Sequence, residues 1–323
     1  MKQTGVSVIT GFLGAGKTTL LKNILERENF QRYVVIVNEF AQIGIDKQLI
    51  VHEEETLFEL SNGCLCCEIR SDLVSLLNEI SEHTEDYAGV IIETSGMASP
   101  MPIIQTFSVD EAVPEGFELE RVVTVVDAGY LDINLAEYPE AADQIACADR
   151  VILNKTSALS DAEKTQAVSR ITSLNPQAGC IITDYSRVDV DELFSVRRES
   201  NPFPVFKPGS IQPAQNGLVI RAAHESNVSS FCLQTENKIN TDIFLDWIQK
   251  LVMYHGNDLI RMKGILFFYD ENSPFVFHGV RNSLDGELDE EQQLTTNNIS
   301  QLVVIGRNLD RDQLTSGFEA CFY

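Results

Sequence analysis

Basic side chains are scarce in this sequence of 323 residues, which has 24 Lys and Arg against 48 Asp and Glu and a formal net charge of −24 at pH 7. Negative charge on this scale repels other polyanions, so we expect neither nucleic acid nor an anionic membrane surface among the partners. Long apolar runs are also missing. No stretch approaches the about 20 residues that a membrane-spanning helix needs, and we therefore expect no transmembrane segment.

Cysteine is infrequent and unevenly placed. Three of the seven cysteines are crowded into Cys64-Leu65-Cys66-Cys67 and the other four are scattered, so they do not form a secreted disulfide framework. Near the N-terminus only Lys2 precedes an apolar stretch that Gly11 interrupts, which does not fit a signal peptide. We expect a cytoplasmic protein in a reducing compartment, where free thiolates persist.

Length and residue patterning predict two domains. The chain is about twice the usual size of a single domain. Through its first two-thirds, short β-branched runs alternate with helical patterns, which predicts an α/β domain with a mostly parallel sheet flanked by helices. Apolar residues at helical spacing predict helices around 20–25 and 69–80. Strands are expected at residues 6–10, 33–37, 56–60, 89–93, 121–126, 150–153 and 180–183.

A cluster of prolines marks the expected domain boundary. Four of the ten prolines fall between residues 202 and 213, which is typical of an extended linker. We therefore assign a first domain to residues 1–200, a linker to 201–217 and a smaller α+β domain to 218–323. The second domain is expected to contain helices at 241–254 and from Asp310 onward, and strands at 219–223, 229–235, 260–269, 274–280 and 302–305.

A phosphate-binding loop is the clearest motif in the sequence. Gly11-Phe12-Leu13-Gly14-Ala15-Gly16-Lys17-Thr18 matches the P-loop pattern and lies between an expected strand and an expected helix. Backbone N–H groups from Gly11 to Gly16, with Gly14 and Ala15 between them, are expected to face the phosphates. Lys17 is expected to reach the β- and γ-phosphates, and the Thr18 hydroxyl is expected to bind Mg²⁺.

A second segment supplies the acid that such a site needs. Glu93 ends a buried strand and is followed by Thr94-Ser95-Gly96. We expect Glu93 to hold the magnesium shell and the backbone N–H of Gly96 to contact a γ-phosphate. Met97 stands where GTPases usually have a glutamine that positions water. Hydrolysis by the protein alone is therefore expected to be slow.

The segment Asn154-Lys155-Thr156-Ser157 follows another buried strand, where GTPases place the guanine-reading Asn-Lys-x-Asp. Asn154 and Lys155 are therefore expected to contact the base. The usual aspartate accepts two hydrogen bonds from guanine, whereas Ser157 offers one weaker contact. We expect GTP to be preferred over ATP, with a blunted preference.

Three thiols stand together in Cys64-Leu65-Cys66-Cys67, before a helix expected to start near Glu68. Thiols near a helix N-terminus ionise readily, and thiolates favour Zn²⁺ or Cu(I) over Mg²⁺ or Ca²⁺. Three ligands are one short of a closed structural zinc site, which leaves a position for exchange. We interpret Cys64, Cys66 and Cys67 as the binding site of a cargo metal. A redox switch and ordinary packing remain alternatives.

Together these motifs resemble the CobW-type, zinc-regulated GTPase metallochaperones, a family that pairs a G domain with a small C-terminal domain. The resemblance rests on the phosphate loop through Thr19, on Asn38-Glu39-Phe40 with Asp46, on Gly63-Cys-Leu-Cys-Cys67, on Glu93-Thr-Ser-Gly96 and on Asn154-Lys155. It covers essentially the whole chain. The wider class includes GTPases that insert nickel into hydrogenase and urease.

The resemblance implies a role for each motif. Cys64, Cys66 and Cys67 would bind zinc, or alternatively cobalt or nickel. Residues 38–46, with Glu39 and Asp46, would form the first switch, residues 93–96 the second, and Thr19 would contact the α-phosphate. Lys17, Thr18 and Glu93 would be the catalytic residues.

The implied function is hydrolysis of GTP, with Mg²⁺ as cofactor, coupled to delivery of the metal to a client protein. Two other functions remain open. The chain would be a nucleotide-gated zinc sensor or buffer if it never delivered metal, and a P-loop kinase if a small molecule accepted the phosphate.

Overall fold

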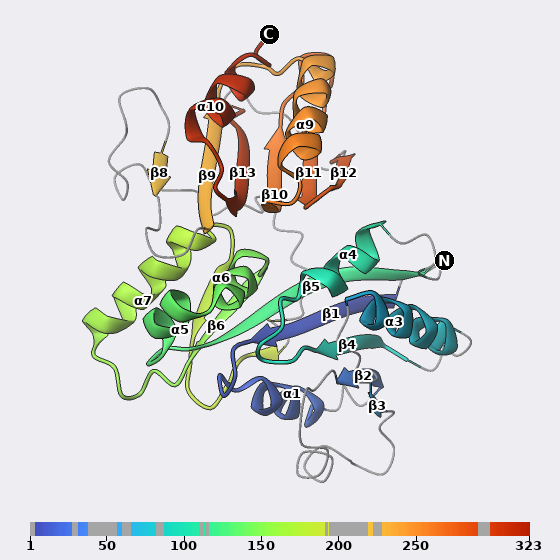
Figure 1. Ribbon diagram of the computed structural model, residues 1–323, viewed down its shortest axis with the longest axis vertical. Coiled ribbons are helices and arrows are strands. Elements are labelled where there is room, and N and C mark those ends of the chain that lie inside the picture. Colours follow the sequence, from blue (N-terminus) through green and yellow to red (C-terminus); the bar gives the residue numbers. More distant parts are fainter. Residues whose placement is uncertain are drawn as a thin grey trace. The chain divides into compact units, whose positions relative to one another are not determined.

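The computed structural model describes residues 4–27, 32–37, 57–59, 66–81, 87–109, 113, 116–190, 193, 219–221, 228–289 and 298–323. The chain divides into two compact units, shown in Figure 1. Unit 1 comprises Met1–Ile171 and Ala178–Ser195, and unit 2 comprises Thr172–Gln177 and Val196–Tyr323. The expected linker at 201–217 lies outside the described residues, and the boundaries drawn from the sequence stay a prediction.

Unit 1 is built on a seven-stranded sheet in the order β3-β2-β4-β1-β5-β6-β7. Every described pair of neighbouring strands in this sheet is parallel, which confirms the expected α/β fold. The strands are β1 (Thr4–Gly11), β2 (Tyr33–Val37), β3 (Leu57–Glu59), β4 (Gly89–Glu93), β5 (Phe117–Asp127), β6 (Arg150–Asn154) and β7 (Gly179–Ile182).

Helices lie on both faces of this sheet, with α1 on one side and α3 and α4 on the other (Figure 1). The apolar spacing in the sequence predicted α1 and α3. The structure has α3 begin at Cys66, two residues before the expected start near Glu68. The helices are α1 (Lys17–Leu25), α3 (Cys66–Ser81), α4 (Met101–Val109), α5 (Leu131–Glu137), α6 (Pro139–Ala146) and α7 (Asp161–Leu174).

The central strands of unit 1 are apolar because both of their faces are covered. β4 is buried at every residue, and Val8 and Ile9 of β1 are fully buried. Ile9 packs in one cluster with Leu20 and Ile24 of α1, which fixes that helix against the sheet. This packing holds the start of α1, and with it the phosphate loop, in a defined position.

Unit 2 contains a six-stranded antiparallel sheet in the order β12-β11-β10-β13-β9-β8. The expected α+β character is confirmed, and β12 is a strand that the sequence analysis did not anticipate. The strands are β8 (Val219–Arg221), β9 (Val228–Thr235), β10 (Leu259–Leu266), β11 (Phe275–Val280), β12 (Ser283–Leu288) and β13 (Ser300–Arg307).

Two helices, α9 (Thr241–His255) and α10 (Arg311–Glu319), pack on this sheet. Each begins at a capping side chain, as N-terminal helix groups require. Asn240 accepts a hydrogen bond from the Ile243 N–H at 3.1 Å, and Asp310 accepts one from the Gln313 N–H at 3.0 Å. The caps fix where the two helices begin.

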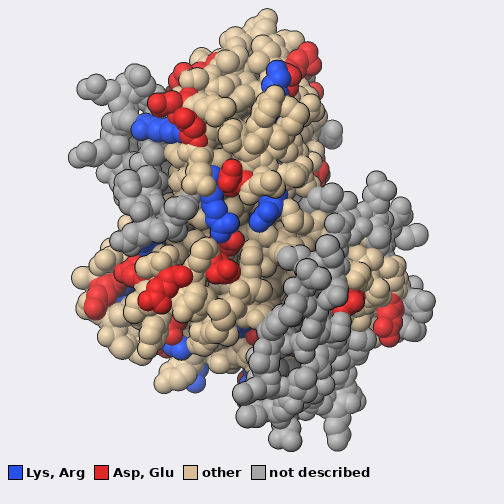
Figure 2. Space-filling view, in the orientation of Figure 1, with Lys and Arg blue, Asp and Glu red and all other residues tan. Residues whose placement is uncertain are grey.

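Two further features concern the molecular surface and the helices: where the acidic side chains lie, and whether a helix is long and apolar enough to span a membrane. Acidic side chains are spread over both units on the face shown in Figure 2 rather than gathered in one patch. Among the described helices, none combines the length and the apolar character needed to cross a bilayer.

Replacing Phe244 with alanine is expected to lower the free energy of unfolding of unit 2 by about 3–5 kcal/mol. The fully buried ring packs against Trp247, Phe268 and Phe277, and its removal leaves a cavity. Trp247 is the only tryptophan in the sequence, so denaturant titration followed by tryptophan fluorescence reports on this unit.

The matched control is Leu245→Ala, because Leu245 lies on the same helix and is 43% exposed. Its effect should stay within about 0.5 kcal/mol. Equal losses in the two variants would contradict a central role for Phe244 in the core.

Candidate functional site

Polar segments follow five neighbouring strands of the unit 1 sheet. They are residues 12–18 after β1, 93–97 at the end of β4, Asp127 at the end of β5, 154–157 at the end of β6 and 183–186 after β7. Carboxyl ends of parallel strands meet at one edge of a sheet, which is where α/β proteins bind their ligands. The topology therefore brings most of the predicted site residues to one edge.

The phosphate loop joins β1 to α1 in the expected way. Gly11 is the last residue of β1, and Gly14, Ala15 and Gly16 lead directly into α1. Gly16 has φ 112°, a left-handed conformation, and a Cβ atom there would lie 2.5 Å from the Asn154 side-chain nitrogen. Only glycine satisfies both conditions at this position.

Lys17 is the first residue of α1 and is only 8% exposed. Its ammonium group donates hydrogen bonds to the carbonyl oxygens of Gly11 at 2.9 Å and Phe12 at 3.3 Å. The charge is therefore held against the loop whose backbone N–H groups are expected to bind phosphate. A lysine ammonium group in this position neutralises negative charge on the β- and γ-phosphates of a bound nucleotide.

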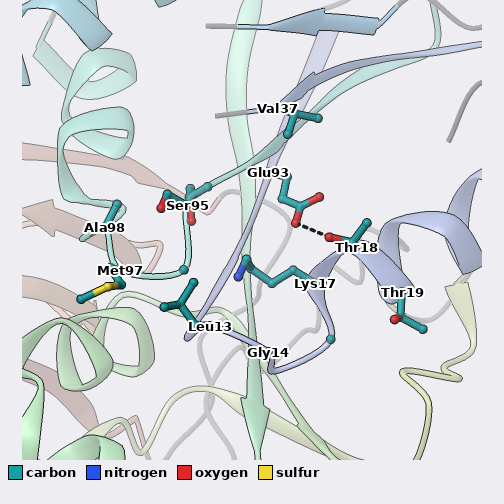
Figure 3. A pocket seen from close by; sticks show the side chains of 13 residues that line it. Leu13, Gly14, Lys17, Thr18, Thr19, Val37, Glu93, Ser95, Met97 and Ala98 are labelled. Atoms are coloured by element: carbon teal, nitrogen blue, oxygen red, sulfur yellow. Dashed lines mark hydrogen bonds between the residues drawn. The ribbon is translucent and has the colours of Figure 1, made fainter. Parts of the chain in front are cut away.

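Thr18 and Glu93 are brought together from α1 and β4. The Thr18 hydroxyl donates a hydrogen bond to the Glu93 carboxylate at 3.0 Å, and Glu93 is 6% exposed. Figure 3 shows Lys17, Thr18 and Glu93 around the same pocket, which has a volume of about 770 Å³. Hard oxygen donors of this kind are those that Mg²⁺ prefers, so the pair fits the expected cofactor.

The loop after β4 lies against the phosphate loop. A Cβ atom on Gly96 would come within 2.8 Å of the Leu13 backbone nitrogen, so glycine permits this close approach. Gln144, which is 1% exposed, donates hydrogen bonds to the carbonyl oxygens of Gly96 at 3.2 Å and Ala98 at 3.0 Å. Met97 is 53% exposed beside the same pocket. Gln144 holds the loop, and the sequence analysis did not identify it.

Asn154 connects the predicted base-binding segment to the phosphate loop. Its side-chain nitrogen donates to the Ala15 carbonyl at 2.8 Å and to the Ser186 hydroxyl at 3.0 Å, and its oxygen accepts the Ser186 N–H at 2.9 Å. The Ser186 hydroxyl in turn donates to the Gly16 carbonyl at 3.0 Å. Through these contacts Asn154 connects the phosphate loop to the loop after β7, in addition to its expected contact with the base.

Lys155 has φ 60° and forms an ion pair with Asp127 at 2.8 Å. The Lys155 side chain is 49% exposed and that of Asp127 is 10% exposed. Asp127 also accepts the Gly129 N–H at 3.0 Å. The ion pair fixes the ammonium group of Lys155 and leaves the aliphatic part of its side chain at the surface. Asp127 was missed, although a polar residue directly after an apolar strand is the signal that identified Glu93.

The predicted cysteine site for the cargo metal and the predicted first switch, with Glu39 and Asp46, lie largely beyond what the structure describes. Cys64, Glu39 and Asp46 fall outside the described residues, whereas Cys66 and Cys67 are the first two residues of α3. Within the described part of the chain, no three metal-binding side chains gather together. Thr19 is exposed in the first turn of α1. The cysteine ligands therefore stay a prediction.

Comparison with known proteins identifies relatives of both units. Residues 5–182 match the family model described as "CobW/HypB/UreG, nucleotide-binding domain", and residues 228–322 match "Cobalamin synthesis protein cobW C-terminal domain". The zinc chaperone YjiA of Escherichia coli is 29% identical over 326 residues, which cover 98% of each chain.

A zinc-regulated GTPase metalloprotein activator of Schizosaccharomyces pombe is 30% identical over 341 residues, covering 95% of this chain and 83% of that protein. Among solved structures, a zinc-bound variant of the YjiA GTPase superposes with a TM-score of 0.76 at 26% identity and covers all of both chains. Over both units, the fold is therefore that of the YjiA GTPase.

Replacing Glu93 with glutamine is expected to weaken Mg²⁺-dependent nucleoside triphosphate binding by about 10- to 100-fold, the usual cost of removing a group that supports a metal site. Titration of a fluorescent nucleotide at several Mg²⁺ concentrations measures the change. The exposed Glu118 on β5 provides the control Glu118→Gln, which should leave binding unchanged. An unaltered Mg²⁺ dependence in Glu93→Gln would exclude Glu93 from the magnesium shell.

Thiol reactivity is expected to separate five of the seven cysteines into two groups. Burial raises the pKa of Cys180 and of Cys232 to about 11. The thiolate is the reactive form, so at pH 8 only about one such thiol in a thousand is ionised. Iodoacetamide at pH 8, followed by peptide mass spectrometry, should therefore label Cys64, Cys66 and Cys67 well before these two.

The labelling rate at Cys180 should rise with pH up to about 11, because the fraction of thiolate rises until the pH passes the raised pKa. Protein unfolded in guanidinium is the control, in which all cysteines should react alike. Labelling of folded Cys180 at the unfolded rate would contradict this grouping.

Proposed function

This chain belongs to the CobW/HypB/UreG family, and from that membership we propose that it is a cytoplasmic GTP-hydrolysing metallochaperone that delivers zinc to a client protein. The relatives named as a zinc chaperone and a zinc-regulated GTPase metalloprotein activator match nearly its whole length. The proposal extends their printed activities to this chain. It places the metal at Cys64, Cys66 and Cys67 and the nucleotide at the phosphate loop.

Backbone topology is the observation that supports a coupling between these two sites. Cys66 and Cys67 begin α3, which follows β3 and leads into β4. A helix that joins two parallel strands runs antiparallel to them, so the start of α3 belongs to the same sheet edge as Glu93. In the strand order, β3 lies three spacings from β1, on the order of 15 Å.

The residues of the phosphate site have clear roles in this proposal. Lys17 neutralises the β- and γ-phosphates, Thr18 and Glu93 hold Mg²⁺ and its water shell, and Thr19 contacts the α-phosphate. When bound, Mg²⁺ would supply positive charge that neutralises the phosphates while the γ-phosphoryl group passes to water. Glu39 and Asp46 belong to the first switch segment.

Zinc is the cargo, and thiolates are ligands suited to it. Three sulfur ligands leave a fourth position through which a client ligand enters as the metal is transferred. Nucleotide state changes zinc affinity because the segment that carries the cysteines lies in sequence between the two segments that respond to the γ-phosphate. A coupling of about 1–3 kcal/mol corresponds to a change of about 5- to 150-fold in zinc affinity.

Metal titration of the wild type and of Cys66→Ser, each with a GTP analogue or with GDP, tests this function. We expect the wild type to bind zinc about 5- to 150-fold more tightly with the GTP analogue. Cys66→Ser should bind zinc more weakly and lose the nucleotide effect, because one of three ligands is removed. A competing chromophoric chelator measures the affinities.

The control is Cys232→Ser, which removes a thiol from unit 2 and should behave as the wild type. Equal zinc affinity with the two nucleotides would contradict the coupling. Nucleotide-sensitive zinc uptake that survives replacement of Cys64, Cys66 and Cys67 together would contradict the site. A client enzyme activated by loaded protein, and not by equal free zinc, would separate delivery from sensing.

A further inference from the structure

A carboxylate lies beside the position where the guanine-reading motif lacks one. Ser157 stands where GTPases usually have an aspartate, and its backbone N–H donates a hydrogen bond to Asp184 Oδ1 at 3.0 Å. Asp184 comes from the loop after β7, 27 residues further along the chain. We propose that Asp184 reads the Watson–Crick edge of guanine in place of the missing aspartate. The inference rests on the proposed function in one respect, that the nucleotide is GTP.

The loops after β6 and β7 are joined over several residues, which fixes Asp184 next to the base-binding segment. The Thr156 N–H donates to the Thr183 carbonyl at 3.4 Å, and the Thr156 hydroxyl donates to the same oxygen at 3.0 Å. A weaker contact at 3.5 Å joins the Thr156 hydroxyl to Asp184 Oδ2. The Asp184 side chain is thus held from two consecutive residues of that segment.

These contacts leave acceptor capacity on Asp184. A carboxylate offers about four lone-pair sites. The Ser157 N–H occupies one site on Oδ1. The single proton of the Thr156 hydroxyl is directed mainly at the closer Thr183 carbonyl, so Oδ2 is engaged weakly. The remaining sites suit two adjacent donors, and Asp184 is only partly buried, so a ligand reaches it.

Guanine presents such a pair of donors, the ring N1–H and the 2-amino group. Adenine has an acceptor at N1 and no 2-amino group, and xanthine has a carbonyl at position 2. A carboxylate therefore attracts guanine and repels the other two bases at this edge. Ser157 alone, with one hydroxyl, would not discriminate in this way.

The loop that carries Asp184 is held in a strained conformation. Tyr185 and Ser186 have φ 56° and 52°, which is costly for residues other than glycine. Asn23 of α1 donates hydrogen bonds to both of their carbonyl oxygens, at 3.0 and 2.9 Å. Asn154 bonds Ser186 as well. The strained loop is thus held by Asn23 of α1 and by Asn154, which also bonds the Ala15 carbonyl of the phosphate loop, so Asp184 keeps a fixed position relative to that loop.

Nucleotide competition on the Asp184→Asn variant tests the proposal. Fluorescent GDP is displaced by GDP, ADP or xanthosine diphosphate, and the affinity ratios are compared within each variant. We expect Asp184→Asn to bind GDP about 10- to 100-fold more weakly, the range for hydrogen bonds to a charged group. Xanthosine diphosphate should bind more tightly than to the wild type, because the asparagine amide donates to the carbonyl at position 2.

The ratio within one variant is insensitive to partial misfolding, which lowers all three affinities together. The charge control is Asp246→Asn, on α9 of unit 2, which should keep the wild-type ratios. A rescue variant, Asp184→Asn with Ser157→Asp, returns a carboxylate to the usual position and should restore the preference for GDP over xanthosine diphosphate.

Three results would contradict the proposed role of Asp184 in reading guanine. An equal loss for all three nucleotides in Asp184→Asn would show that Asp184 only braces the loop, and an unchanged guanine to xanthine ratio would likewise overturn the inference. So would a rescue variant that binds nucleotide as tightly as the wild type without a guanine preference. Wild-type protein that prefers ADP would instead contradict GTP as the nucleotide, which is a failure of the proposed function.

Discussion

Parallel strand pairing is the constraint on which the rest of unit 1 depends. It brings the carboxyl ends of β1, β4, β5, β6 and β7 to one sheet edge, so residues up to 170 positions apart in sequence form direct hydrogen bonds there. Burial of both sheet faces fixes the strand positions. The polar segments that follow the strands are thereby placed without extensive structure of their own. The groups expected to bind phosphate, Mg²⁺ and the base therefore lie close together at one edge.

Hydrogen bonds through Asn154 and Ser186 turn these neighbouring loops into one unit. Both side chains are buried, at 2% and 0% exposure, and their contacts reach the carbonyl oxygens of Ala15 and Gly16. Removing a partner from such a network leaves buried polar groups unpaired, at a cost of about 1–3 kcal/mol each. The phosphate loop and the base-binding loop are therefore expected to move together, so a nucleotide that fits one is held in register with the other.

Sequence reasoning reaches groups that are neighbours in the chain and does not reach partners that are distant in it. The phosphate loop and Glu93 were predictable because each directly follows an apolar strand. Asp184 was not, because its bond to Ser157 becomes visible only when β6 and β7 are placed side by side. The strand β12 was missed for a different reason. Half of its six residues are polar, none is fully buried, and Gly286 is a residue that strands disfavour, so the segment gives little strand signal at the edge of the unit 2 sheet.

Two departures from the usual GTPase motifs have different consequences for this chain. At position 157 the missing carboxylate has a neighbour, Asp184, which accepts a hydrogen bond from the Ser157 N–H and which we propose reads the base in its place. At position 97 no such replacement is present among the described residues that line the phosphate pocket, none of which carries a side-chain amide. Gln144 does not serve, because its amide donors are occupied by Gly96 and Ala98. We therefore expect hydrolysis by the protein alone to be slow.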